Sequence, residues 1–132
     1  MTVRILITGS RCLNDYDLVH QAIADAVAEL GPDAVVVHGN CKRRDGAPGA
    51  DQLADRAARV LGLKPEPHSA RWRTEGRAAG PLRNQRMVDL GADLCLVFLV
   101  AGLANVGTKD CWRRAERAGI PVRVFEQQEA TR

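Results

Sequence analysis

The sequence has no hydrophobic run long enough to cross a membrane. Its longest apolar stretch, residues 94–104, contains 11 residues and includes Gly102, whereas a membrane-spanning helix needs about 20 residues. Only Arg4 precedes the short apolar stretch that ends at Thr8 and Gly9, which is not the pattern of a secretory signal. We therefore expect a cytoplasmic protein with no membrane partner.

Paired cysteines and aromatic residues are also scarce. The four cysteines lie far apart and none forms a CxxC pair, so the sequence predicts no zinc site and indicates no cofactor. Only five residues are Phe, Trp or Tyr, which does not favour a stacking surface for single-stranded nucleic acid. Cys95 lies in the most apolar stretch, so we expect it in the core.

Two nucleotide-binding fingerprints are absent. The sequence contains neither GxGxxG nor GxxxxGK(S/T), which are the glycine patterns of dinucleotide-binding folds and of P-loop NTPases. Neither of these classes is therefore indicated.

Positive charge comes mainly from arginine, with 16 Arg and three Lys against 16 acidic residues. The net charge of +3 is too small to require nucleic acid as a partner. The charge is unevenly distributed, because residues 71–86 contain five Arg and one acid, and residues 41–45 form a second basic cluster. These clusters predict local anion binding, with solvated positive surface as the alternative.

The chain of 132 residues has the length of one compact domain. Strands without polar alternation, separated by amphipathic helices, indicate a parallel sheet covered on both faces. We predict an α/β fold, a Rossmann-like three-layer sandwich with a mainly parallel sheet of about five strands, over residues 1–125, and a C-terminal tail at 126–132. The expected strands are residues 3–8, 34–38, 94–100 and 120–125 and an edge strand at 64–68, with helices after Asp15 and Gly49, from Pro81 as first helical residue, and from Gly107-Thr108.

Ligands of open parallel sheets bind beyond the carboxyl ends of the strands, where the strand order reverses. The loops expected at that edge contain glycines, which let backbone N–H groups at a helix N-terminus approach phosphate oxygens. Together they predict a phosphate-bearing, nucleotide-type ligand, although a glycine after a strand can also serve the turn alone. The candidate ligand-binding residues are Gly9, Ser10, Arg11, His38, Gly39, Asp51, Arg83, Asn84, Gly107 and Thr108.

Several of these side chains suit a phosphorylated sugar. Arg11 and Arg83 could each bind a phosphate as a planar two-donor fork, with surface charge as the alternative. Thr108 could offer its hydroxyl and N–H to an oxyanion, or act only as a helix N-cap. Asp51 could accept a ribose hydroxyl, or only stabilise the start of its own helix. Asn84 lies beside Arg83 and could reach the same ligand.

No catalytic residue can be assigned from the sequence. Ser10 is a nucleophile candidate, but no base stands at a suitable spacing. His38 could act as that base across the site, although a histidine at the end of a strand is more often structural. Trp72, between Arg71 and Arg73, could stack on a base, although we expect it to pack on the sheet.

Several short motifs occur in an order that resembles the small YspA-like SLOG domains. They are ITGSR at residues 7–11, VHG at 37–39, GADQLA at 49–54, GPLRNQRMV at 80–88, GT at 107–108 and AGIPV at 118–122. The resemblance covers about residues 3–125, and GPLRNQRM is its most specific part. It implies a Rossmannoid fold related to the LOG and DprA families and a site for a nucleotide or an ADP-ribose-like derivative, in a sensor or accessory module.

The same resemblance indicates two alternative functions. LOG-type phosphoribohydrolases carry a PGGxGTxxE motif, whose glutamate assists cleavage of an N-glycosidic bond. Residues 104–111 of this chain read ANVGTKDC, so Cys111 stands in place of that glutamate, and a thiol cannot replace the carboxylate. Phosphoribohydrolase activity is therefore the second hypothesis, and single-stranded nucleic acid binding, implied by the DprA relationship, is the third. The sequence leaves a homo-oligomer open.

Overall fold

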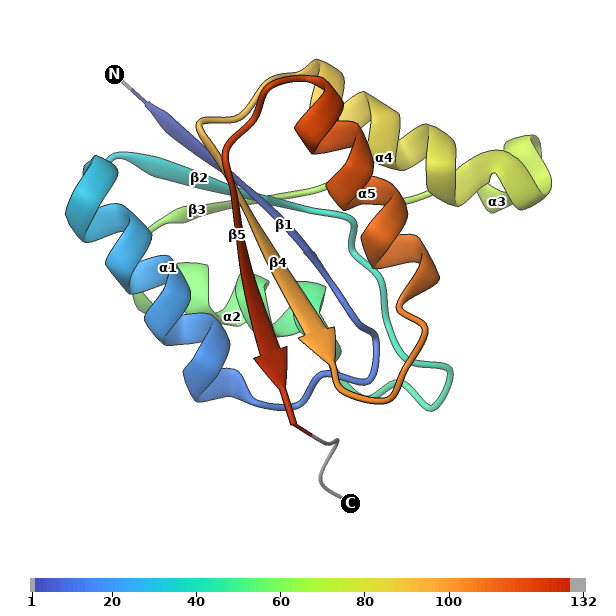
Figure 1. Cartoon of the computed structure of the whole chain (residues 1–132), viewed down its shortest axis with the longest axis horizontal. Helices are drawn as coiled ribbons and strands as arrows, with labels where there is room; N and C mark the ends of the chain where they lie inside the picture. The colour runs from blue at the N-terminus through green and yellow to red at the C-terminus, as the bar shows by residue number, and fades with distance from the viewer. Residues whose placement is uncertain (1, 129–132) are drawn as a thin grey trace.

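A computed structural model describes residues 2–128, which form one sheet between two layers of helices (Figure 1). The strands are β1 (Val3–Gly9), β2 (Ala34–His38), β3 (Lys64–Pro67), β4 (Leu94–Val100) and β5 (Val122–Gln127). The helices are α1 (Tyr16–Leu30), α2 (Ala50–Val60), α3 (Trp72–Glu75), α4 (Ala79–Asp89) and α5 (Val106–Arg117), with a 3₁₀ turn η1 (Gly76–Ala78) between α3 and α4. The predicted Rossmann-like α/β class is confirmed.

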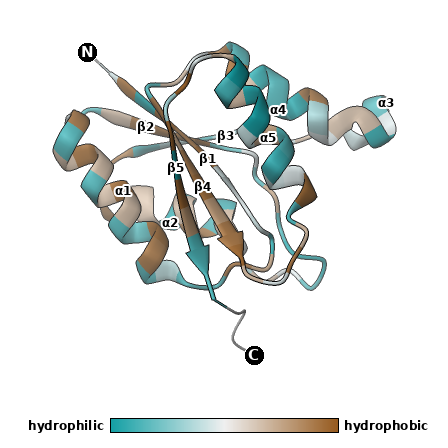
Figure 2. Cartoon of the chain, in the orientation of Figure 1, coloured by the Kyte–Doolittle hydropathy of each residue, from teal (hydrophilic) through white to brown (hydrophobic). Residues whose placement is uncertain are grey.

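The sheet has the strand order β3-β2-β1-β4-β5, and every neighbouring pair is parallel. Strand β4, next to the centre of the sheet, is hydrophobic along its length, whereas the helices also carry hydrophilic residues (Figure 2), as a sheet covered on both faces requires. The chain passes from β1 outward to β3 and then returns to β4 beside β1. The strand order therefore reverses between β1 and β4.

The two helical layers form as the sequence predicts. Asp15 caps α1, because its carboxylate accepts a hydrogen bond from the N–H of Leu18 at 3.1 Å, which satisfies one of the free donors of the first turn. Helices α1 and α2 pack against each other, as do α4 and α5, and each pair buries nonpolar residues against the sheet. The predicted edge strand is also confirmed, since β3 lies at the sheet edge with its two prolines.

Two predicted boundaries were wrong. Helix α4 begins at Ala79, so Pro81 is its third residue and not its first; the chain is already helical through α3 and η1, and a proline in the first turn still removes no helical hydrogen bond. Strand β5 runs from Val122 to Gln127, whereas we expected a strand at residues 120–125 and a tail from residue 126. Gln127 is buried, and its side-chain oxygen accepts hydrogen bonds from the N–H groups of Asn14 and Asp15, each at 3.0 Å. Residues 129–132 of the expected tail lie outside the described residues.

Candidate functional site

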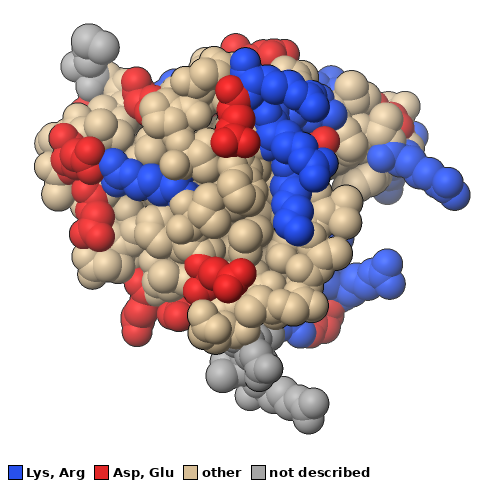
Figure 3. Space-filling view, viewed as in Figure 1, with Lys and Arg blue, Asp and Glu red and all other residues tan. Residues whose placement is uncertain are grey.

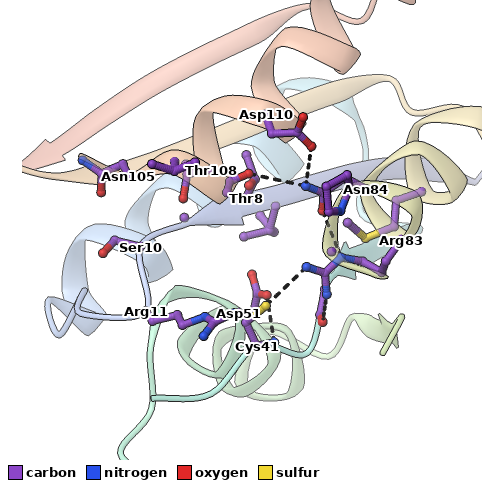
Figure 4. Close-up of a pocket in the computed structure, with 18 of the residues that line it drawn as sticks. Thr8, Ser10, Arg11, Cys41, Asp51, Arg83, Asn84, Asn105, Thr108 and Asp110 are labelled. Carbon is purple, nitrogen blue, oxygen red and sulfur yellow. Dashed lines mark hydrogen bonds between the residues drawn. The ribbon is translucent and has the colours of Figure 1, made fainter. Parts of the chain in front are cut away.

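A pocket of about 460 Å³ lies at the carboxyl ends of β1 and β4, where the strand order reverses. Its wall comes from the loops after β1, β2 and β4, from the first turns of α2 and α5, and from α3 and α4 (Figure 4). The volume is in the range of small-molecule sites, and the position is the one at which open α/β sheets bind ligands.

Nine of the ten predicted site residues line this pocket, and His38 does not. The His38 ring is fully buried, with Nε2 2.8 Å from a carboxylate oxygen of Asp55 and Nδ1 accepting the N–H of Asn40 at 3.1 Å. Because both ring nitrogens have partners inside the protein, His38 is not placed to act as a base for Ser10. These contacts support the alternative that His38 has a structural role.

The loop after β1 is fixed by its own hydrogen bonds. The hydroxyl of Ser10 accepts the N–H of Cys12 at 3.1 Å, and the backbone of Ser10 bonds to Phe98 at 3.0 Å and Ala50 at 3.1 Å. A side chain at Gly9 would clash with Ala50 and crowd Phe98. Gly9 is therefore required by the close packing of β1, β4 and α2, rather than by a ligand alone.

Arg83 is a buried arginine whose guanidinium bonds mainly to the protein. Its Nε donates to Asn84 at 2.9 Å, one terminal nitrogen donates to the carbonyl of Gly39, and the other approaches the sulfur of Cys41 at 3.4 Å. A Cβ at Gly39 would lie 2.6 Å from the guanidinium, so the absence of a side chain there makes room for Arg83. Arg83 lines the pocket, but most of its donors are already used.

Asp51 brings a buried carboxyl to the pocket from the first turn of α2. One carboxylate oxygen accepts the N–H of Cys41 at 3.0 Å. Burial raises the pKa of Asp51, although the N–H of Cys41 and the Arg83 guanidinium oppose the shift. The site thus contains a carboxyl that can accept hydrogen bonds and that is protonated more easily than an exposed one.

The opposite wall is the start of α5. Asn105 precedes the helix in a left-handed conformation, with φ of 52°, and α5 begins at Val106. Thr108 is therefore the third residue of the helix, which excludes the interpretation of Thr108 as N-cap, and its buried side chain lines the pocket. At Gly107 an added Cβ would meet nothing within 4 Å, so the space beside this backbone is open.

Asp110 and Asn84 connect α5 to α4 across the pocket. The side-chain amide of Asn84 donates to Asp110 at 3.0 Å, and Arg114 donates to the same carboxylate at 2.9 Å. Burial opposes ionisation of Asp110, but these two hydrogen bonds outweigh it and lower its pKa. Asp110 was not among the predicted residues, although its place two residues after Thr108 in the first turns of a helix could have indicated it.

Trp72 is the clearest residue that the sequence led us to place wrongly. Its side chain does not pack on the sheet, because it belongs to the short helix α3, is 53% exposed and lines the pocket. An exposed indole beside a polar pocket offers a flat face for stacking. The alternative in which Trp72 stacks on a base therefore gains support.

The basic run at residues 71–86 is divided by the fold. Arg83 is buried, and Arg86 forms an ion pair with Glu75, whereas Arg71, Arg73 and Arg77 are exposed. A further group of positive side chains, which includes exposed Arg113 and Arg117, lies over α5 (Figure 3). The run therefore does not present one continuous row of free arginines.

Cys111 and Cys95 lie in the core and not in the pocket. Burial raises the pKa of the Cys111 thiol to about 12 and also raises the pKa of Cys95, so both remain neutral thiols. Within residues 2–128, the His, Cys, Asp and Glu side chains form no group of three that could hold a metal ion. In the same part of the chain, no helix combines the length and hydropathy needed to cross a bilayer.

Comparison with known proteins adds to this geometry. A family model described as the YspA, cpYpsA-related SLOG family matches residues 3–74. A protein of Mycobacterium phage D29 called Gene 61 protein is 45% identical over 124 residues, which cover 90% of this chain and 93% of the phage protein. The matched motifs include the loops after β1 and β2 and the start of α2, all of which line the pocket or support its wall. On this basis the chain belongs to the YspA, cpYpsA-related SLOG family.

Proposed function

We propose that this protein binds a nucleotide or a nucleotide-derived molecule, such as ADP-ribose, in the pocket between β1 and β4, and acts as a sensor or accessory module. The observation that carries the proposal is the pocket itself, which lies at the strand-order reversal and combines polar side chains with an exposed aromatic ring. Membership of a SLOG family supports the same ligand class.

The side chains of the pocket match the parts of such a ligand. Asp51 and Asn84 can bond to ribose hydroxyls or to polar edges of a base, because their side chains are buried and line the pocket. Trp72 offers its exposed indole to the face of the base. Arg11 is exposed, lines the pocket and has no ion pair with a carboxylate of the described residues, so it is free to meet an anionic group.

Thermal-shift measurements and calorimetry with AMP, ADP, ADP-ribose and adenosine test the proposal, because a ligand that binds only the folded state raises its stability. In the variant Trp72→Ala, we expect the affinity for a stabilising nucleotide to fall about 5- to 150-fold, since stacking of one base contributes roughly 1–3 kcal/mol. Leu90→Ala is the matched control, because Leu90 is 55% exposed and does not line the pocket.

The unliganded stability of both variants should hardly change, since both side chains are largely exposed. A wild-type protein that none of the four compounds stabilises would contradict the proposed function. Equal affinity in Trp72→Ala and Leu90→Ala would show that the indole does not stack on the ligand.

Cleavage of an N-glycosidic bond remains a second candidate because of the buried Asp51 carboxyl in the pocket. Cys111, which stands where the related hydrolases have a glutamate, does not line the pocket, so Asp51 would have to supply the carboxyl. Chromatography of AMP after long incubation with an equimolar amount of protein decides between the two functions. Release of adenine from AMP by the wild type, but not by Asp51→Asn, would replace the binding proposal with hydrolysis.

A further inference from the structure

A second hollow of about 380 Å³ adjoins the main pocket. It lies on the outer side of the loop after β2, against the chain that leads into α3. The two hollows share part of their walls, so a ligand can extend from one into the other. The shared residues are Arg11, Gly39, Cys41, Trp72 and Arg83.

The two hollows differ in charge. The outer hollow is lined by the cations Arg11, Lys42 and Arg83 and by no carboxylate, whereas the main pocket shares Arg11 and Arg83 but is also lined by the carboxylates of Asp51 and Asp110. Arg11 and Lys42 are exposed, and neither forms an ion pair with a carboxylate of the described residues. An anion is therefore favoured in the outer hollow, while carboxylates of the main pocket favour hydroxyl and amino groups.

The loop that carries Lys42 is held in place before any ligand arrives. Asn40 has a positive φ of 53°, and its side chain donates to Ser69 at 3.0 Å and accepts from Gln52 at 2.8 Å. The N–H of Asn40 donates to His38, which gives this buried histidine a positioning role. A fixed loop loses little conformational freedom on binding, and the short backbone bridge between Lys42 and Pro48 adds a further restraint.

We infer that the outer hollow is the anion subsite of the ligand, in which Arg11 and Lys42 bind a terminal phosphate, while the sugar and base lie in the main pocket against Asp51 and Trp72. The inference rests on the proposed function and gives the bound nucleotide a direction. It differs from the expectations that Arg83 binds the phosphate and that Thr108 offers its hydroxyl and N–H to an oxyanion. Arg83 is part of the wall that the two hollows share. Because most of its donors are used in hydrogen bonds within the protein, the phosphate binds to the exposed cations Arg11 and Lys42.

Calorimetry with AMP and adenosine on wild type, Lys42→Ala and Arg44→Ala tests this subsite. Arg44 is a matched control, because it is an exposed cation two residues away that lines neither hollow. We expect Lys42→Ala to weaken AMP binding about fivefold or more and to leave adenosine binding unchanged, since only AMP carries the phosphate. Arg44→Ala should change both affinities less than twofold.

Three results would overturn the inference: an equal loss of AMP and adenosine affinity in Lys42→Ala, no loss of AMP affinity in Lys42→Ala, or an equal loss of AMP affinity in Arg44→Ala. Inorganic pyrophosphate separates this inference from the proposed function. If wild type binds pyrophosphate in a Lys42-dependent way but binds none of AMP, ADP, ADP-ribose and adenosine, the anion subsite stands and the proposed function fails. If wild type binds neither pyrophosphate nor any of these four compounds, both fail.

Discussion

The two faces of the sheet bury different kinds of side chain. On the face covered by α1 and α2, the cluster of buried nonpolar residues has 19 members, including Phe98, Ile23 and Leu13. On the face covered by α4 and α5, the corresponding cluster has nine members, and Met87 at its border lines the pocket. Because buried nonpolar area is the main source of stability, the α1/α2 face contributes more to folding.

The α4/α5 face buries several of the polar side chains near the pocket. Thr8, Arg83, Asn84 and Thr108 are buried there with hydrogen-bond partners or beside the pocket. Nearer the amino end of the sheet, Arg4 and Glu66 form an ion pair of 2.7 Å between β1 and β3. The comparison shows that the face with the smaller nonpolar core supplies most of the buried polar side chains of the pocket, to which α2 on the other face adds Asp51, since groups that recognise a polar ligand cannot also form a nonpolar core.

Removal of Phe98 tests the α1/α2 face. This side chain is fully buried and its ring stacks on Phe125 at 5.3 Å between centroids. We expect Phe98→Ala to reduce the free energy of unfolding by about 3–5 kcal/mol, because it loses nonpolar burial and leaves a cavity. Urea denaturation measures the loss, with Leu90→Ala as an exposed control below about 0.5 kcal/mol. A loss in Phe98→Ala under 2 kcal/mol would mean that this face does not dominate stability.

Removal of Arg83 tests the α4/α5 face. We expect Arg83→Ala to reduce the free energy of unfolding by about 1.5–3 kcal/mol, because the buried carbonyl of Gly39 loses a charged donor. Arg83→Lys should not restore it, since an ammonium cannot reproduce the planar contacts to Gly39, Asn84 and Cys41. Arg77→Ala, an exposed arginine of the preceding turn, is the control.

Denaturation and ADP titration of the same Arg83 variants distinguish a role of Arg83 in ligand binding from a role in stabilising the fold. Unchanged stability together with lost ADP affinity would show that the guanidinium serves the ligand and not the fold, as the sequence-based hypothesis of a phosphate fork requires. Reduced stability with retained ADP affinity in Arg83→Lys would place Arg83 among the structural residues of the pocket wall.

The smallest expected effect concerns the ion pair between Arg4 and Glu66 on the α4/α5 face. Hydrogen bonds from Arg4, opposed by burial and assisted by His68, lower the pKa of Glu66 to about 2. A carboxyl with a lowered pKa stabilises the fold fully above its unfolded pKa of about 4.5, and this contribution disappears as the pH falls towards 2. Because the pair is partly exposed, we expect Glu66→Gln to cost roughly 1 kcal/mol or less at pH 7.

Thermal unfolding of wild type and Glu66→Gln between pH 7 and pH 2 checks this dependence, since the difference between the two should shrink below about pH 4.5. Glu29→Gln is the control on the other side of the molecule, because Glu29 pairs with Arg123 and is 59% exposed. A Glu66→Gln difference that stays constant with pH would show that its cost is not electrostatic.

Local sequence signals were sufficient for most of the elements. Short apolar runs predicted β1 and β4, a β-branched run predicted β2, and the apolar spacing after Asp15 predicted α1, because burial on both faces or on one helical stripe leaves a direct pattern in the residues. The short helical segment before Pro81 escaped prediction, since α3 and η1 bury no residue and so carry no such pattern.

Where the site lies could also be inferred from the sequence. Parallel strands place all their following loops at one edge, so motifs far apart in the chain predict one pocket, and nine of ten chosen residues line it. What each residue does there was decided by tertiary contacts. Gly39 makes room for Arg83, His38 holds Asn40, and Trp72 stands exposed beside the pocket.

The sequence by itself determined the layered α/β architecture and the edge at which a ligand can bind. Hydrophobic periodicity can be read from residues that are close together in the chain, and parallel strands place all of their following loops at one edge. Only the tertiary structure decided which cations are free. Arg11 and Arg83 both lie within motifs of the sequence, yet the Arg83 guanidinium is buried against Gly39 and the Arg11 guanidinium is exposed at the wall shared by the two hollows. Partner atoms from distant strands and loops make that difference, and no local pattern encodes them.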